Sequence, residues 1–136
     1  MSKKFWGVSD LLGNTVVPES FPVALGTAAS ISEGMGVVIS SNNMAEVANG
    51  ATSFGGIAAG PSDETAAAAG VVLVYRAPIL KFHAFATTPG NLSASTLLTK
   101  VTLDVTGSDH TIDENDTSSG FVEIVKQVDT SRGECV

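Results

Sequence analysis

The sequence predicts an all-β protein, a single compact antiparallel β-barrel or sandwich with an extended N-terminal arm. Beyond residue 20, short runs of apolar and β-branched residues are interrupted about every eight to twelve positions by Gly, Asn, Pro or Ser, as in sandwiches and barrels. The chain has 136 residues, 43% of them hydrophobic, which suits one domain with one core. We therefore divide it into an arm, residues 1–20, and a β-rich domain, residues 21–136.

The arm shows neither the strand period of 2 nor the helix period of 3.6, and it contains Gly7, Gly13 and Pro18. Disorder is common at chain ends. This segment, however, has more apolar side chains than a solvated tail usually carries: Phe5, Trp6, Val8, Leu11, Leu12, Val16 and Val17. We predict that these residues bind a partner, and that the arm is disordered in the free protein and becomes ordered on that partner.

A hairpin is predicted where residues 35–40 and 44–48 flank Ser41-Asn42-Asn43, because Asn tolerates the left-handed conformation of tight turns. The next strand, residues 54–59, contains Gly55-Gly56. Paired glycines within a strand indicate a bulge or a close approach of another backbone.

Residues 71–77 are apolar at nearly every position, which predicts a central strand that is buried on both faces and ends at Pro78. Residues 79–86 alternate instead. One face of that strand should join the core, and the other should carry Ile79, Lys81, His83 and Phe85.

Residues 97–106 and 121–128 also alternate and predict half-buried antiparallel strands, with Thr102 facing solvent and Val128 facing inward. Residues 134–136 are expected to add a short closing strand. Residues 61–70 could form a short stable helix or, equally well, a single helical turn or an ordered loop. The side chains expected inside the barrel are Val72, Val74, Leu80, Phe82, Val101, Leu103, Val122 and Ile124.

The overall composition argues against several classes of partner. Seven basic and fourteen acidic side chains give a net charge of −7, so the positive surface that binds nucleic acid is not expected. Apolar stretches fall short of the 18 or so residues that cross a membrane, and the first residues do not resemble a signal peptide, so we expect synthesis in the cytoplasm. The one cysteine, Cys135, allows neither an internal disulfide nor a multi-cysteine zinc site.

Catalytic signals are weak. His83 falls within a predicted strand and is interpreted as a surface or interface histidine, and His110 falls in the predicted loop 107–111 and is interpreted as part of a solvated turn. The Gly-x-Ser-x-Gly elbow is missing, as are nucleotide-binding glycine motifs. We expect no enzymatic activity and no cofactor.

Five acidic residues cluster near the C-terminal third of the chain: Asp104, Asp109, Asp113, Glu114 and Asp116. Carboxylates at such density could bind a divalent cation, but the segment lacks the ligand spacing of an EF-hand loop. We therefore predict a solvated acidic loop and no metal site.

Three segments carry a resemblance to a known family: Glu33-Gly34-Met35-Gly36-Val37-Val38, Phe54-Gly55-Gly56-Ile57-Ala58, and residues 69–75 leading into residues 79–85. In this order they resemble the capsid decoration proteins of tailed bacteriophages, also called head-stabilising or cementing proteins, which have a small β-barrel-like or β-tulip fold. The resemblance extends from about Pro22 to the C-terminus. The acidic segment after Val105 departs from it.

The resemblance implies a structural virion protein without enzymatic activity. Such a protein, commonly a homotrimer, binds the outer surface of the assembled capsid and stabilises it by bridging subunits of the major capsid protein. Two alternatives belong to other classes: a host- or glycan-binding module of a virion fibre or tail, and a small metal-assisted enzyme.

Overall fold

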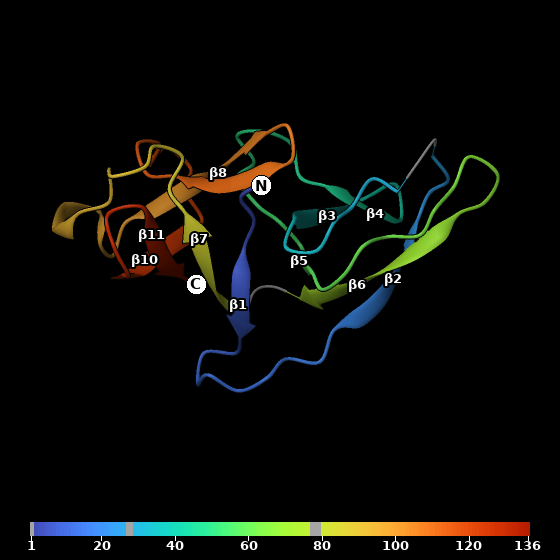
Figure 1. Ribbon diagram of the computed structural model, residues 1–136, viewed down its shortest axis with the longest axis horizontal. Coiled ribbons are helices and arrows are strands. Elements are labelled where there is room, and N and C mark those ends of the chain that lie inside the picture. The colour runs from blue at the N-terminus through green and yellow to red at the C-terminus, as the bar shows by residue number, and fades with distance from the viewer. Residues whose placement is uncertain (1, 27–28, 77–79) are drawn as a thin grey trace.

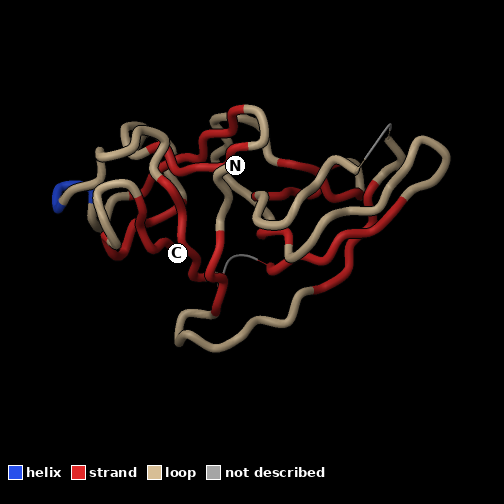
Figure 2. Tube along the Cα trace, viewed as in Figure 1, coloured by secondary structure: helices blue, strands red, loops and turns tan. Residues whose placement is uncertain are grey.

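The computed structural model describes residues 2–26, 29–76 and 80–136. These residues form two antiparallel β-sheets, which confirms the predicted all-β class (Figures 1 and 2). In chain order the strands are β1 (Trp6–Ser9), β2 (Glu19–Val23), β3 (Gly36–Ser40), β4 (Asn43–Glu46), β5 (Gly56–Ala58), β6 (Gly70–Arg76), β7 (Lys81–Phe85), β8 (Lys100–Thr106), β9 (Asp109–Asp113), β10 (Val122–Gln127) and β11 (Arg132–Cys135). One short 3₁₀ helix, η1 (Ala94–Thr96), precedes β8.

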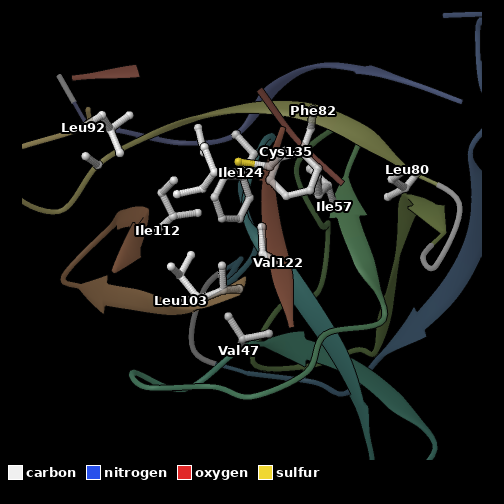
Figure 3. Packing of buried hydrophobic residues seen from close by; sticks show 14 residues of the cluster. Val47, Ile57, Leu80, Phe82, Leu92, Leu103, Ile112, Val122, Ile124 and Cys135 are labelled. Atoms are coloured by element: carbon white, nitrogen blue, oxygen red, sulfur yellow. The ribbon is translucent and has the colours of Figure 1, made fainter. Parts of the chain in front are cut away.

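The first sheet has the order β1-β7-β11-β10-β8-β9 and curls on itself. Three strands separate β7 from β9, yet Ala86 at the end of β7 bridges Ile112 of β9. The curled sheet encloses the larger core, part of which is labelled in Figure 3. Val47 and Ile57, which come from the second sheet and its flank, pack into the same core, so the two sheets are joined through it.

The second sheet has the order β2-β6-β5-β3-β4 and lies beside the first (Figure 1). It covers a smaller core made of Val23, Ile31, Val37, Met44, Ala58, Val72 and Val74.

The predicted hairpin is confirmed by β3 and β4. Ser41 and Asn42 connect these strands with φ of 51° and 68°, and two left-handed residues in succession match the twist of a two-residue hairpin. The close approach predicted at Gly55-Gly56 is also confirmed. A Cβ atom on Gly56 would lie 2.1 Å from the carbonyl oxygen of Tyr75 on β6, so a side chain does not fit there.

The predicted alternation is confirmed in three strands, because the inward side chains of β7, β8 and β10, and that of Leu80 just before β7, are buried: Leu80, Phe82, Ala84, Val101, Leu103, Val122 and Ile124. Two neighbouring expectations are wrong. Thr102 is buried because its hydroxyl donates to the Asp116 carboxylate, at 3.1 Å, and Val128 is exposed because β10 ends at Gln127.

The expectation that β6 is buried on both faces is wrong. Val72 and Val74 are in the core, whereas Val71 and Leu73 are 49% and 48% exposed. Since no second layer of described residues covers the outer face of this sheet, β6 has one solvent-facing side. The strand end predicted at Pro78 and the outward position of Ile79 lie outside the described residues.

Residues 61–69 form an ordered loop without a helical turn, and Gly70 already begins β6. The Asp63 carboxylate accepts the Val71 N–H at 2.7 Å, which holds this loop against the start of β6. The predicted closing strand is present as β11, but it begins at Arg132 and lies between β7 and β10 inside the first sheet.

The arm contains a strand in its middle, although its sequence shows no strand period. Trp6–Ser9 form β1, which pairs with β7, and Phe5 is in the core at 3% exposure. The boundary placed between residues 20 and 21 falls inside β2. Each of these strands pairs with a strand that lies 47 or more residues further along the chain, and local sequence periodicity does not reveal such a partner.

Candidate interaction surface

The seven apolar residues predicted to bind a partner divide into three groups in the fold. Phe5 is enclosed, with its ring centroid 5.0 Å from that of Phe82, and does not reach the surface. Val8 and Val16 are half-buried and pack against the larger core. Trp6, Leu11, Leu12 and Val17 remain accessible.

Trp6 belongs to a half-exposed aromatic cluster on the outer side of the first sheet. Its ring stacks on His83, with the centroids 5.4 Å apart and the planes inclined by 21°, and lies 4.8 Å from the ring of Phe85. Gly7 allows this stacking, because a Cβ atom there would lie 2.5 Å from Nδ1 of His83. His83 is half-buried beneath β1, and its Nε2 is 3.5 Å from the Glu134 carboxylate.

Residues 10–18 form a loop between β1 and β2, which we call the apolar loop. Its tip extends away from both sheets at the bottom of Figure 1, whereas Val16 packs against the larger core. Asp10 organises its tip: one carboxylate oxygen accepts the N–H groups of Leu12 and Asn14, at 2.8 and 2.9 Å. Two backbone hydrogen bonds, Asp10 N–H to Asn14 and Gly13 N–H to Asp10, close the turn. These backbone donors stabilise the charged carboxylate and lower the pKa of Asp10.

The apolar loop presents large hydrophobic side chains to solvent. Leu11, Leu12 and Val17 are 57%, 88% and 82% exposed. Exposed apolar side chains that gather on one structured segment are typical of protein interaction sites. Asp10 therefore holds the two leucines on a turn that is already formed.

His110 is the largest departure from the sequence interpretation. It lies in β9 and is fully buried, not in a solvated turn. Its Nε2 is 2.9 Å from Oε1 of Glu46, and its Nδ1 accepts the N–H of Gly36 at 3.1 Å. Burial lowers its pKa, against the opposing effect of Glu46. The alternation of residues 109–113 after Gly107 is the sequence signal that could have predicted this hairpin.

The acidic segment is only partly solvated, so that prediction is corrected as well. Glu114 is buried and accepts the Thr88 N–H at 2.9 Å, Asp109 accepts the Lys3 N–H at 2.7 Å, and Asp116 binds Thr102. Each of these carboxylates ties separate segments together. Within the described ranges, no three His, Cys, Asp or Glu side chains are grouped so that they could hold a metal ion.

The other chemically notable side chains are enclosed or isolated. Cys135 is buried, and desolvation raises its pKa to about 12, so the sulfur stays a thiol at neutral pH and is a poor nucleophile.

An apolar cavity of about 250 Å³ is lined by Phe54, Leu80, Phe82 and Phe121, among others. A more open hollow of about 420 Å³ contains Ser30 and Glu64. Neither histidine lines either space.

Comparison of the chain with protein-family models, with curated proteins and with solved structures finds no match in any of the three. Among the residues that the structure describes, no helix is long and apolar enough to cross a membrane. The strongest candidate for an interaction surface is the apolar loop, because it exposes large hydrophobic side chains, together with the half-exposed aromatic cluster of Trp6, His83 and Phe85.

Proposed function

We propose that this protein is a structural component of a virion, which binds the outer surface of an assembled capsid and stabilises it by bridging subunits of the major capsid protein. The observation that carries the proposal is the apolar loop, with Leu11, Leu12 and Val17 exposed on a turn that Asp10 holds in shape. Burying one leucine completely contributes about 1.5–3 kcal/mol, and a turn that is already formed loses little entropy on binding.

Bridging requires a second contact surface, and the outer face of β6 provides one. Val71 and Leu73 are about half exposed there, on a rigid sheet. In our proposal one of the two surfaces contacts the capsid, and the other contacts either a second capsid subunit or a second copy of this chain in a homotrimer. The resemblance of residues 33–38, 54–58 and 69–75 to capsid decoration proteins supports the same function. Such a function needs binding without turnover, and neither a cofactor nor nucleic acid.

The test is co-sedimentation with expanded, empty heads of a tailed phage. We expect the protein to pellet with the heads at stoichiometric occupancy. Changing Leu11→Ser and Leu12→Ser together should raise the Kd for the heads at least tenfold, since about 1.4 kcal/mol of lost burial already gives that factor.

Leu98→Ser is the matched control, because Leu98 is also strongly exposed but lies outside the apolar loop. It should bind like the unaltered protein. If the unaltered protein stays in the supernatant at every head concentration, the proposal is wrong.

A second candidate, a host- or glycan-binding module of the virion, is favoured by the half-exposed cluster of Trp6, His83 and Phe85. Aromatic ring faces provide rigid contact area in binding sites. Binding to a glycan array that disappears in Trp6→Ala, without binding to heads, would favour this candidate over capsid stabilisation.

A further inference from the structure

We propose that His110 is a proton-sensitive latch, which in its neutral form holds β9, the β3–β4 hairpin and residues 3–5 together and which loosens this junction when it is protonated. The proposal concerns the free protein and does not depend on the proposed function. It follows from the hydrogen bonds around the imidazole ring.

Both ring nitrogens have partners that define one neutral form. The backbone N–H of Gly36 donates to Nδ1 at 3.1 Å, so Nδ1 carries no proton. The proton is then on Nε2, which donates to the Glu46 carboxylate at 2.9 Å. Gly36 begins β3 and Glu46 ends β4, whereas His110 is in β9, so this one ring joins the second sheet to the first.

The N-terminal segment is held at the same place. The His110 N–H donates to the Lys3 carbonyl at 2.8 Å, and the Lys3 N–H donates to the Asp109 carboxylate. Two residues later, the Phe5 N–H donates to the Gly34 carbonyl at 3.0 Å, and the Phe5 ring meets the imidazole edge-on with the centroids 6.2 Å apart. Residues 3–5 thus lie between the strand of His110 and the segment that enters β3.

A second proton on the ring has to occupy Nδ1. It would then face the Gly36 N–H, so that two donors oppose each other and a buried backbone N–H loses its acceptor. Glu46 and Asp109 favour the charged ring, and Lys4 disfavours it. Burial is the largest effect, and it lowers the pKa of His110 below the ordinary value of 6.5.

The sign of the pH dependence follows from that direction. Because the pKa is lower in the folded protein, the unfolded or opened chain binds the proton more readily. The stabilisation that the neutral latch provides is complete above pH 6.5 and is lost as the pH falls from 6.5 toward the folded-state pKa. Mild acid should therefore loosen residues 3–5, and with them the attachment of β1 and of the apolar loop that follows it.

Amide hydrogen exchange followed by NMR tests the latch in the full chain. After correction for intrinsic rates, protection of the Gly36, Phe5 and His110 amides should fall between pH 7.5 and 5.5, by up to about tenfold for one pH unit below 6.5. Constant protection of these amides over that range would overturn the proposal.

Two substitutions assign the effect to one histidine. His110→Asn keeps an acceptor near the position of Nδ1 but does not titrate, so protection of the Gly36 and Phe5 amides should become independent of pH in this range. His83→Asn removes the other histidine of the chain and should leave the pH dependence as it is. The opposite pattern, with the dependence lost in His83→Asn and kept in His110→Asn, would refute the latch.

A measurement on the unaltered protein covers the case in which His110→Asn does not fold. The His110 Cε1–H resonance should titrate with a midpoint below 6.5, and the amide resonances of Gly36 and Phe5 should move with the same midpoint. A midpoint at or above 6.5, or amide resonances that do not follow the ring, would refute the proposal.

Discussion

Replacing Phe5 with alanine tests whether the N-terminal segment is part of the core. The side chain is 3% exposed, and its ring lies 5.0 Å from the ring of Phe82 and 6.2 Å from that of His110. Burying a phenylalanine of this kind stabilises a protein by about 3–5 kcal/mol, including about 0.5–1.5 kcal/mol for a good aromatic pair. The free energy of unfolding of a native protein is only about 5–15 kcal/mol, so Phe5→Ala should remove a large share of the stability.

The assay is urea denaturation followed by circular dichroism and by the fluorescence of Trp6, the single tryptophan of the chain. We expect the free energy of unfolding to fall by about 3–5 kcal/mol and the melting temperature by roughly 10 °C or more. Leu12→Ala is the control from the same segment. Since Leu12 is 88% exposed, its loss should change stability by no more than about 0.5 kcal/mol.

A loss below about 1 kcal/mol for Phe5→Ala would refute the reasoning. It would mean that residue 5 contributes little to the folded core, and it would favour the disordered arm that the sequence predicts. Deleting residues 1–17 distinguishes the same two views: a disordered arm can be removed at little cost in stability, whereas the structure predicts strong destabilisation because the deletion removes Phe5 and β1.

Three further outcomes are expected. Cys135, buried and with a pKa raised to about 12, should react with a disulfide reagent at pH 8 only after unfolding, and fast labelling of the native protein would contradict its burial. Gly56→Ala should destabilise the protein by several kcal/mol, because the new methyl group would meet the Tyr75 carbonyl, whereas Gly60→Ala, which has open space, should be close to neutral in the same denaturation assay. Chelator should leave the melting temperature unchanged, because the carboxylates of residues 104–116 bind backbone and hydroxyl groups. A drop of several degrees that added calcium restores would reveal a cation site there.

Much of the fold could be predicted because its signals are local. In β7, the alternation of side chains places Phe82 and Ala84 on the buried face. Ser41 and Asn42 adopt the left-handed conformation that the turn between β3 and β4 requires. Gly56 is needed where β5 approaches β6, and the glycine pair indicated this approach before its partner was known. Each of these signals lies within a few residues of the structure that it predicts.

The errors occur where burial depends on distant partners. The apolar run of β6 indicated two buried faces, but whether Val71 and Leu73 are covered depends on what packs over the sheet. The acidic neighbours of His110 in the sequence indicated that its side chain is exposed to solvent. That histidine is buried because β9 completes the curled first sheet and because Glu46, 64 residues away, provides a partner for its ring.

For the candidate site, too, some features could be predicted from the sequence and others depended on the tertiary structure. By itself, the sequence determined that residues 5–17 carry an unusual number of apolar side chains, because composition is visible without coordinates. Only the tertiary structure decided that Phe5 belongs to the core while Leu11, Leu12 and Val17 remain in solvent. The physical reason is that exposure depends on which strands the segment meets. The pairing of β1 with β7 turns Phe5 inward, and the Asp10 turn holds Leu11 and Leu12 in solvent.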